Sequence, residues 1–255
     1  MGLAELNVIP QATGAAAKTV ENHQAPQELI LHAAWFCPFA HRVWITLEEK
    51  GVPYQYKEVN PYKKEPHFLA INPKGLVPVI EYKGKALSES LILVEFVEEA
   101  FPQAPNLLPR DPVERAEARQ WIDSINKQFI YPYQRLLQAQ GAENQKAALE
   151  DVYHFLRNFS ESIKGPYFLG EQFSLVDIVI APWIMRDWVV TQHRGYRREN
   201  ASPRWKIYAD LVQKRESVAN TLSLQEHTIG IYDQYLRDEA ESEAAKAIRE
   251  GRAIP

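Results

Sequence analysis

The residues with the clearest chemical potential in this sequence surround its single cysteine, Cys37. Cys37 is followed by Pro38 and lies between a short apolar run, residues 29–33, and a segment with helical periodicity. Because proline is common at the first position of a helix, we expect Cys37 at a helix N-terminus. Unpaired N–H groups and the positive end of the helix dipole favour a thiolate over a thiol there. We therefore interpret Cys37 as a nucleophile, although a buried structural role is more common for a lone cysteine.

The spacing around Cys37 is similar to that of a Cys-x-x-Cys redox site, but Ala40 occupies the position of the second cysteine. Cys37 can therefore form a mixed disulfide that it cannot release by internal attack, and a second thiol must come from solution. Glutathione is the obvious cytosolic supplier of that thiol. His41 and Arg42 follow on the same helix, where we expect a packing or surface pair rather than a general base.

A second motif, residues 72–80, places Pro78 directly before a predicted strand. A proline at this point suits a cis peptide bond, which would expose the N–H and C=O groups of Val77 for pairing with an extended peptide. The alternative is a plain turn into an edge strand, and the motif alone does not decide between the two.

A third motif, residues 87–90, places polar side chains at the start of another predicted helix. The free N–H groups of that helix, together with Glu89 and Ser90, could bind a carboxylate and an ammonium group. The alternative is simple capping of the helix by Ser88 or Glu89, and capping and binding can coexist.

The elements that position these motifs follow from hydrophobic periodicity and from proline and glycine punctuation. In the first half, the pattern predicts strands at 29–33, 54–59, 79–82 and 86–87, and helices at 38–50, 66–70 and 89–101. Four prolines, at positions 102, 105, 109 and 112, then fall within eleven residues and indicate a stiff linker. Beyond them, the pattern predicts helices at 113–140, 145–164, 174–190, 203–216 and 229–249.

This order predicts an α/β domain followed by an all-α domain. The length of 255 residues fits between one and two domains. We expect an N-terminal extension at residues 1–26, the α/β domain at 27–102, the linker at 103–112 and the helical domain at 113–255.

The composition excludes several functional classes. Lys and Arg total 29 against 33 Asp and Glu, so the formal charge of −4 provides no basic field for nucleic acid or an anionic membrane. No apolar run approaches the ~20 residues of a membrane-spanning helix, and we assign no secretory signal and no metal site. One cysteine cannot form an internal disulfide and fits a reducing compartment, so we predict a cytoplasmic protein.

Taken together and in this order, the three motifs resemble the glutathione-binding half of a glutathione transferase. The sequence Cys-Pro-Phe-Ala at residues 37–40, with the N-terminal extension, is similar to the omega class rather than to the Tyr- or Ser-based classes. The resemblance covers residues 27–236. It implies a thioredoxin-like N-terminal domain, which is α/β, followed by an all-α C-terminal domain.

The resemblance also implies roles for individual residues. Cys37 is similar to the family's nucleophile and Phe39 to a residue packed near it. The implied glutathione contacts are Lys64 near the glycyl carboxylate, Val77 and Pro78 at the peptide-pairing position, and Glu89 and Ser90 at the γ-glutamyl group. The implied acceptor pocket involves Tyr131, Trp183 and Arg186 of the helical half. Ser174 and Asp177 have the spacing of a capping box, which is a structural motif.

The implied function is glutathione-dependent thiol transfer or reduction through a mixed disulfide at Cys37. The implied acceptors are glutathionylated proteins or small molecules, dehydroascorbate and α-glutathionyl ketones. The alternatives are a non-catalytic ligand carrier of the same fold and a glutathionyl-hydroquinone reductase. The expected partners are glutathione, a small hydrophobic or disulfide-bearing acceptor, and a second copy of the chain in a homodimer.

Overall fold

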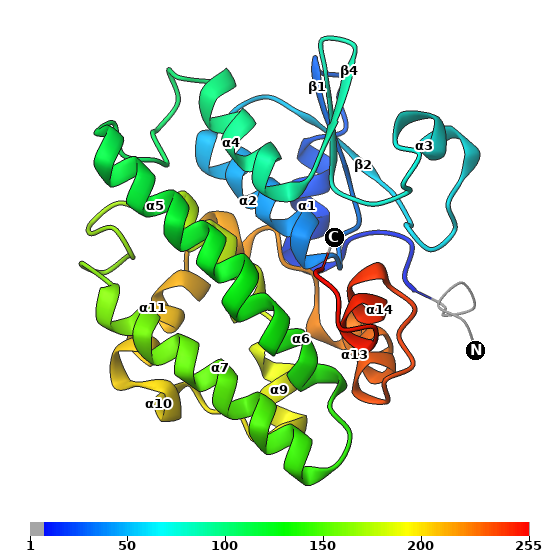
Figure 1. Cartoon of the computed structure of the whole chain (residues 1–255). Coiled ribbons are helices and arrows are strands. Elements are labelled where there is room, and N and C mark those ends of the chain that lie inside the picture. Colours follow the sequence, from blue (N-terminus) through cyan, green and yellow to red (C-terminus); the bar gives the residue numbers. More distant parts are fainter. Residues whose placement is uncertain (1–7, 255) are drawn as a thin grey trace. The chain divides into compact units, whose positions relative to one another are not determined.

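The computed structural model describes residues 8–254, and their contacts divide the chain into two compact units. The sheet unit comprises residues 8–108 and 214–227, and the helical unit contains residues 109–213 and 228–254. Figure 1 shows the elements of both units in chain order. The predicted succession of an α/β half and an all-helical half agrees with this structure.

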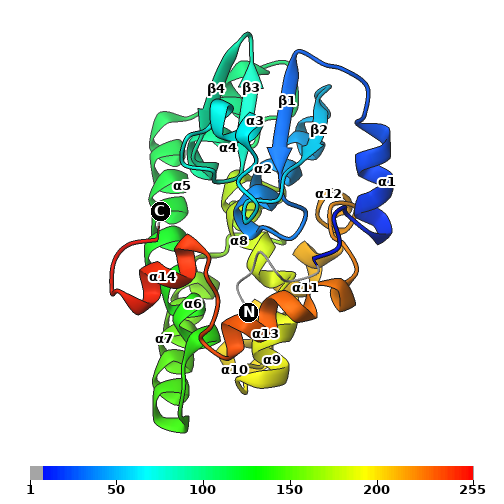
Figure 2. The ribbon, with the colours of Figure 1, turned by 90° about the vertical axis from the view of Figure 1, so that its right-hand side faces the viewer.

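The sheet unit is built on a mixed four-stranded sheet. Its strands are β1 (Leu29–Ala33), β2 (Gln55–Glu58), β3 (Val79–Tyr82) and β4 (Lys85–Ser88). They lie in the order β2-β1-β3-β4, and only the β1–β2 pair is parallel (Figure 2). Parallel strands need a crossover connection, and the helix α2 (Pro38–Lys50) provides it. The end of β1 therefore leads directly into the start of α2.

Helices cover the sheet because each brings an apolar stripe to it. The helix α2 buries Val43 and Leu47 completely and packs against α4 (Ser90–Ala100). The short helix α3 (Pro66–Ile71) contributes Phe68 to a separate buried cluster. The other members of that cluster come from β3 and from the segment after β2. Gly51 ends α2 in the left-handed conformation, with φ of 59°, as the sequence predicts.

The N-terminal extension contains a helix that belongs to the sheet unit. This helix, α1 (Gly14–Asn22), is tied to the segment after α12 (Glu216–Ala219), because the Thr19 hydroxyl donates to the Asn220 carbonyl at 2.7 Å. At the end of α1, the His23 carbonyl accepts a hydrogen bond from a backbone N–H of the edge strand β2 at 2.8 Å. The extension thus covers part of one edge of the sheet.

The division into units therefore differs from the expected domains in two ways. Residues 8–26 fold with the sheet unit, whereas the sequence analysis placed them in a loose extension; residues 1–7 of that extension lie outside the described residues. Residues 214–227, expected within the helical domain, also belong to the sheet unit. The physical reason is that these two segments bond to each other and to α2, where Arg215 pairs with Glu49 at 2.7 Å.

The helical unit follows the predicted pattern with three interruptions. Its helices are α5 (Pro112–Ser124), a π-helical turn η2 (Ile125–Phe129), α6 (Ile130–Gln138), α7 (Ala142–Ser162), α8 (Leu175–Ile184), α9 (Asp187–His193), α10 (Arg198–Ala201), α11 (Pro203–Gln213), α13 (Ile229–Leu236) and α14 (Glu243–Arg249). A short 3₁₀ turn, η3 (Gln225–Thr228), precedes α13.

Each interruption corrects a helix that the sequence predicted as continuous. The predicted helix 113–140 contains the π-helical turn. The predicted helix 174–190 ends early at Ile184, two residues after Pro182, and α9 begins at Asp187. The predicted helix 229–249 is divided in two, with Asp238 in the left-handed conformation at φ of 59° between its parts.

Asp177 holds the start of α8 to its surroundings. Its carboxylate accepts from the Ser174 N–H at 2.8 Å and from the Ser174 hydroxyl at 2.7 Å, which confirms the predicted capping box. It also accepts from the Phe168 N–H at 2.8 Å and from the Tyr208 hydroxyl at 2.7 Å. Burial raises the pKa of Asp177 although these four donors act in the opposite direction. The motif is structural.

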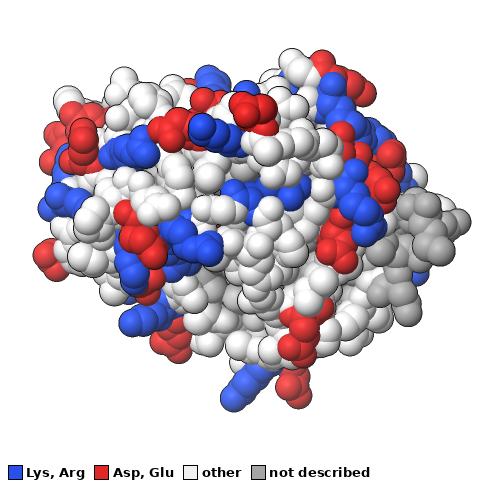
Figure 3. Space-filling view, turned by 90° about the horizontal axis from the view of Figure 1, so that it is seen from below, with Lys and Arg blue, Asp and Glu red and all other residues white. Residues whose placement is uncertain are grey.

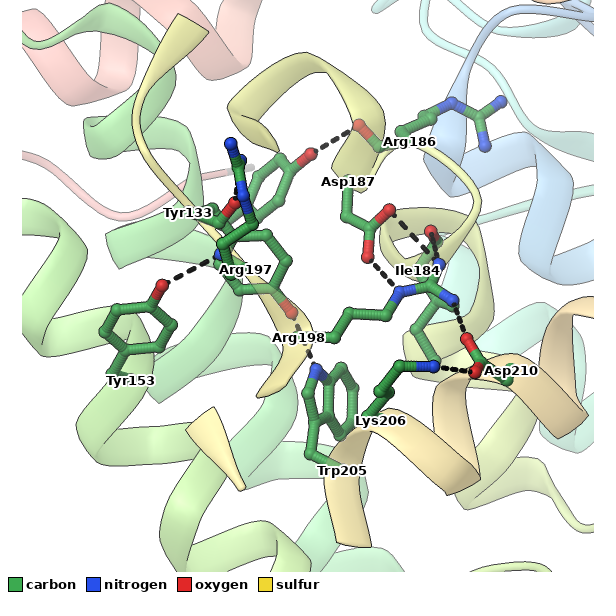
Figure 4. A network of polar contacts seen from close by, with 11 residues as sticks. Tyr133, Tyr153, Ile184, Arg186, Asp187, Arg197, Arg198, Trp205, Lys206 and Asp210 are labelled. Carbon is green, nitrogen blue, oxygen red and sulfur yellow. Dashed lines mark hydrogen bonds and ion pairs between the residues drawn. The ribbon is translucent and has the colours of Figure 1, made fainter. Parts of the chain in front are cut away.

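A second polar network surrounds Arg198 in the helical unit (Figure 4). Its guanidinium contacts Asp187 at 2.6 Å and Asp210 at 2.7 Å, and it donates to the Ile184 carbonyl at 3.2 Å. Lys206 contacts the other oxygen of Asp210 at 2.6 Å. Burial raises the pKa of Asp187 despite the adjacent cation. The network connects the ends of α8, α9 and α10 with α11.

Candidate functional site

Cys37 occupies the position directly before the first residue of α2, as predicted. A turn leads to it from β1, closed by the Cys37 N–H, which donates to the Ala34 carbonyl at 2.9 Å. The Cys37 carbonyl accepts the first bond of the helix from the His41 N–H at 3.0 Å, and Pro38 stands at N1. The thiol is half-buried, with Sγ 3.9 Å from the Val77 carbonyl oxygen. The sulfur therefore lies at the positive end of a 13-residue helix.

Glu58, the last residue of β2, contacts the turn that carries Cys37. Its Oε1 accepts from the Trp35 N–H at 2.9 Å, and its Oε2 accepts from the Tyr56 hydroxyl at 3.1 Å. Burial raises the pKa of Glu58 to about 8, and these two hydrogen bonds offset only part of the effect. Trp35 also donates its indole N–H to the Ile9 carbonyl at 2.9 Å. The backbone two residues before Cys37 is thus held by a largely protonated carboxyl group at neutral pH.

Arg42 lies five residues after Cys37 on α2 and is completely buried. Its Nη1 donates to the Ser90 hydroxyl at the start of α4 at 3.2 Å, and its Cζ lies 5.4 Å from the centroid of the Phe39 ring. Burial lowers the pKa of Arg42 to about 9, and the charge of Cys37 acts in the opposite direction. Arg42 therefore contacts one candidate binding residue, Ser90, and interacts electrostatically with the candidate nucleophile.

The loop before β3 contains the predicted cis peptide bond, between Val77 and Pro78. Asn72 supports this loop, because its Nδ2 donates to the Leu76 carbonyl at 2.9 Å. Val77 is half-buried and Pro78 is buried. The carbonyl of Val77 faces the sulfur of Cys37, so the structure brings the first and second sequence motifs together.

Lys64 is exposed, but its aliphatic stem lies beside the same loop. A Cβ added to Gly75 would lie 3.5 Å from Lys64 Cδ and 3.1 Å from Leu69 Cδ2. Gly75 has φ of 66°, so both its backbone conformation and its close neighbours favour glycine. Lys64 itself has φ of 45°, which is uncommon for a residue with a side chain. The aliphatic stem of Lys64 thus lies beside the loop that contains Val77.

Glu89 and Ser90 lie at the start of α4. The Glu89 carbonyl accepts the first bond of this helix from the Leu93 N–H at 2.9 Å, with Glu89 at φ of 75°. Its carboxylate contacts Lys74 Nζ at 2.9 Å, and both side chains are exposed. Ser90 accepts the hydrogen bond from Arg42. The Glu89 carboxylate is thus paired with the ammonium group of Lys74, and its role in binding stays a prediction.

The three predicted acceptor residues lie in the helical unit. Tyr131 is half-buried on α6, whereas Trp183 and Arg186 are buried. Arg186 Nη1 donates to the Pro182 carbonyl at 2.9 Å, and the Arg186 carbonyl accepts from the Tyr133 hydroxyl at 2.9 Å. In Figure 4, the Arg186 side chain points away from the polar network around Arg198. Their role in binding an acceptor stays a prediction.

Sequence reasoning missed two residues that contact the segments on either side of the cysteine: Glu58, which binds the Trp35 N–H, and Arg42, which lies over the Phe39 ring. It grouped Arg42 with His41 as a packing or surface pair. His41 is buried, with its Nε2 2.8 Å from the Thr221 hydroxyl, whereas Arg42 contacts Ser90. The helical spacing from Cys37 could have placed Arg42 on the same helix, but its partner comes from α4. Glu58 lies 23 residues from Trp35 in the chain, and no motif joins the two.

Within the sheet unit, these groups form a coherent set. The Cys37 sulfur lies beside the Val77 carbonyl, while the start of α4 carries the Glu89 carboxylate and the Ser90 hydroxyl group, which accepts from the buried Arg42. A thiol-bearing peptide with free ammonium and carboxylate groups offers the complementary chemistry. The arrangement can therefore bind such a peptide and exchange its thiol with Cys37.

The surface offers no sign of a nucleic-acid site on the face seen in Figure 3. Acidic and basic side chains are interspersed over that face. Such a mixture does not build the basic field that a phosphate backbone requires. Over residues 8–254, no helix combines the length and the apolar character that crossing a membrane requires.

Comparison with protein families gives two matches along the chain. The model for the glutathione S-transferase N-terminal domain matches residues 36–100, and that for the C-terminal domain matches residues 121–194. The chain is also 36% identical over 201 residues to "Probable glutathione S-transferase parC" of Nicotiana tabacum. That alignment covers 78% of this chain and 90% of the tobacco protein.

Comparison with solved structures gives consistent results. The chain is 59% identical to glutathione transferase Omega 3C from Trametes versicolor, with a TM-score of 0.87, over 91% of this chain and 100% of that one. It is 26% identical to a tau-class glutathione S-transferase from mango, Mangifera indica, with a TM-score of 0.75, over 81% and 98% of the two chains. These matches confirm the predicted fold class, a thioredoxin-like domain followed by a helical domain.

Proposed function

Because the chain belongs to the glutathione S-transferase family, whose co-substrate is glutathione, we propose that it is an omega-like thiol transferase with Cys37 as nucleophile. The observation that carries this proposal is the position of Cys37 at the N-terminus of α2. A serine or tyrosine at such a site can only activate bound glutathione, whereas a cysteine can exchange its sulfur with a disulfide. The proposed thiol–disulfide exchange therefore depends on the single cysteine.

The proposed reaction has two exchange steps. In the first, the Cys37 thiolate attacks the glutathionyl sulfur of a mixed disulfide, forms a Cys37–glutathione disulfide and releases the acceptor thiolate, which takes a proton from solvent. In the second, the thiolate of a second glutathione attacks the sulfur of the bound glutathionyl group. This step releases oxidised glutathione and restores the Cys37 thiolate. One disulfide is broken and one is formed: the mixed disulfide of the acceptor and one glutathione thiol become the acceptor thiol and oxidised glutathione.

Glutathione is proposed to lie across the loop before β3 and the start of α4. The backbone of Val77 would pair with its cysteinyl peptide group, with Pro78 fixing the entry into β3. Glu89 would bind the γ-glutamyl ammonium group, and Ser90 the γ-glutamyl carboxylate at the helix start. Lys64 would approach the glycyl carboxylate, and Phe39 would pack near the sulfur. The contacts among these residues in the sheet unit support this placement.

The omega assignment is supported by the Cys-Pro-Phe-Ala sequence and by the 59% identity to an omega-class structure. The proposed acceptors are glutathionylated proteins or small molecules, dehydroascorbate and α-glutathionyl ketones, bound with the help of Tyr131, Trp183 and Arg186. A non-catalytic ligand carrier and a glutathionyl-hydroquinone reductase are the alternatives that the assay must separate. The proposed assembly is a homodimer in a reducing, cytoplasmic setting, which would keep Cys37 available for exchange.

The test compares the wild type with Cys37→Ser in two assays: thiol transfer from a small glutathionyl mixed disulfide, and conjugation of glutathione to an aryl halide. Serine keeps the donors at the helix terminus but cannot enter thiol–disulfide exchange. Transfer should therefore be lost, while glutathione affinity changes by less than about threefold and conjugation is retained or rises. Glutathione affinity is measured by calorimetry.

Alkylation of the wild-type protein with iodoacetamide tests the role of Cys37 independently, because the chain has one cysteine. Transfer activity should be lost in proportion to the incorporated label. Near wild-type transfer by Cys37→Ser would show that Cys37 is a bystander. Absence of transfer by the wild type, together with glutathione binding, would instead favour the carrier.

A further inference from the structure

Both backbone groups of Cys37 are hydrogen-bonded, one to the turn before it and one to the helix after it. The Cys37 N–H donates to the Ala34 carbonyl at 2.9 Å, which closes the turn that contains Trp35. The Cys37 carbonyl accepts from the His41 N–H at 3.0 Å, which forms the first bond of α2. The position of the sulfur therefore depends on how this turn and the first turn of α2 are fixed.

The turn before Cys37 is held by the N-terminal segment of the sheet unit. The indole N–H of Trp35 donates to the Ile9 carbonyl at 2.9 Å, and the Trp35 side chain is buried. The backbone N–H of Trp35 donates to Glu58 at 2.9 Å. A buried donor that loses its acceptor is costly, so these two bonds resist displacement of the turn. The segment that contains Ile9 thus contacts the turn that leads to the candidate nucleophile.

The first turn of α2 is held by the segment that follows α12. The Nε2 atom of His41 lies 2.8 Å from the Thr221 hydroxyl oxygen, and both side chains are buried. The Thr221 hydroxyl donates its one proton to the Ser217 carbonyl at 2.6 Å, so it accepts from the N–H of His41. This buried bond resists displacement of His41 for the same reason as the bonds of Trp35.

The two segments that hold Cys37 are also bonded to each other. The Thr13 N–H donates to the Ser223 hydroxyl at 3.1 Å, and the Thr13 hydroxyl accepts from the Leu224 N–H at 3.1 Å. The Thr19 hydroxyl donates to the Asn220 carbonyl at 2.7 Å, and Figure 2 shows α1 beside α12. The two segments therefore form one connected support, which we call the brace.

We propose that the brace, residues 8–23 and 214–227, positions the sulfur of Cys37 for reaction, acting through Trp35 on one side and His41 on the other. Trp35 and His41 are positioning residues, because they act through the backbone of Cys37. The inference rests on the proposed function, since it explains how the proposed nucleophile is held at the N-terminus of α2. The reactivity of the sulfur can be measured without turnover, so the two ideas can fail separately.

The alternative is that the brace only stabilises the sheet unit. It also contacts the C-terminal part of α2, where Arg215 and Ser217 bind Glu49, and those contacts serve stability. A purely stabilising brace would affect the melting temperature but not the reactivity of Cys37 in the folded protein. A positioning brace affects both, because a displaced sulfur loses the stabilisation of its thiolate by the helix N-terminus, and small displacements slow a reaction strongly.

The experiment uses the full-length protein and two variants, one for each side of Cys37. Trp35→Phe keeps an aromatic ring but removes the donor to Ile9, and Thr221→Val keeps the side-chain shape but removes the acceptor for His41. The first measurement is the pH midpoint of Cys37 alkylation by iodoacetamide, and the second is kcat for transfer from a small glutathionyl mixed disulfide. Calorimetry gives the Kd of glutathione.

In both variants, the alkylation midpoint should rise by about 0.5 pH units and kcat should fall about tenfold. The Kd of glutathione should change by less than about threefold, because the proposed glutathione contacts lie outside the brace. Thr221→Ser keeps the hydroxyl group, so it should restore the wild-type midpoint and kcat.

Two matched controls carry the same substitutions elsewhere on α2. Trp44→Phe removes the indole donor to the Tyr54 hydroxyl at 2.7 Å, and Thr46→Val removes the hydroxyl donor to the Arg42 carbonyl at 2.8 Å. Both controls should lower the melting temperature but leave the alkylation midpoint within about 0.2 pH units of the wild type. Their kcat should stay within about twofold of the wild-type value.

Circular dichroism checks that each variant is folded, and if Trp35→Phe does not fold, Thr221→Val and Thr221→Ser decide the question. The inference is overturned if folded Trp35→Phe or Thr221→Val has the wild-type midpoint and kcat, or if Thr221→Ser changes as much as Thr221→Val. It is also overturned if either control changes as much as its matched variant, because the effect would then be a general loosening of α2. If the midpoints shift as expected but Cys37→Ser still transfers thiols, the inference is retained and the proposed function is rejected.

Discussion

The carboxyl group of Glu58 provides a quantitative test of the structure, because its pKa is raised from 4.5 to about 8 by burial. The change to examine is Glu58→Gln, which keeps an oxygen to accept from the Trp35 N–H and an amide to contact the Tyr56 hydroxyl. The variant therefore removes the titration while retaining the shape and most hydrogen-bonding capacity. Any pH-dependent difference in stability is then due to ionisation.

The sign follows from proton binding. Between pH 4.5 and about 8, the unfolded chain releases the Glu58 proton whereas the folded protein keeps it. The folded state then binds more protons than the unfolded state, so the free energy of unfolding of the wild type falls as pH rises through this window. Below pH 4.5 and above about 8, this contribution no longer changes with pH.

The magnitude has an upper limit of ~5 kcal/mol, because each pKa unit corresponds to about 1.36 kcal/mol. Glu58 is only half-buried by its exposed area, and solvent screening reduces the effect. We therefore expect the free energy of unfolding of Glu58→Gln, relative to the wild type, to rise by ~2–3 kcal/mol from pH 5 to pH 8.5.

Urea unfolding followed by tryptophan fluorescence at pH 5, 6.5 and 8.5 measures this difference, provided that the slope with urea is the same in both proteins. Glu21→Gln is the matched control, because Glu21 is an exposed glutamate in α1 of the same unit. The free energy of unfolding of Glu21→Gln should stay within about 0.5 kcal/mol of the wild-type value at every pH. If the difference in unfolding free energy between Glu58→Gln and the wild type does not change with pH, the pKa of this carboxyl group is not raised by burial.

Two further predictions concern the rest of the molecule. Asp177→Ala should lower the free energy of unfolding by ~3–4 kcal/mol, because it leaves four buried donor groups without their acceptor; urea unfolding measures it. Asp123→Ala, which removes an exposed pair with Lys127, should cost less than ~1 kcal/mol, and equal losses in both variants would contradict this account. The proposed homodimer predicts about twice the 29.3 kDa chain mass in light scattering, and a monomer at all concentrations would contradict it.

Local features of the sequence were sufficient to predict much of this protein. The Cys37-Pro38 junction predicts the start of α2, and Gly51 predicts its end, since both depend on backbone preferences of neighbouring residues. The spacing of Ser174 and Asp177 predicts the capping box for the same reason. The alternation of strands and helices predicts the order of the two halves.

Interruptions of helices were harder to predict, because an amphipathic pattern continues across a short break. The pattern of residues 229–249 is compatible with one helix, yet Asp238 turns the chain between α13 and α14. The sequence pattern likewise did not predict that residues 8–26 and 214–227 belong to the sheet unit. Those segments are about 200 residues apart in the chain, and their contacts with each other, such as the hydrogen bond from Thr19 to Asn220, form only in the folded protein.

The surroundings of Cys37 were decided by tertiary structure alone. The sequence determined that a lone cysteine would stand at a helix start, because this requires only neighbouring residues. It did not determine that Arg42 would meet Ser90 from α4, or that Glu58 from β2 would hold the backbone of Trp35. Burial, which sets the charge state of both side chains, depends on how distant segments pack around them, and no local pattern encodes that packing.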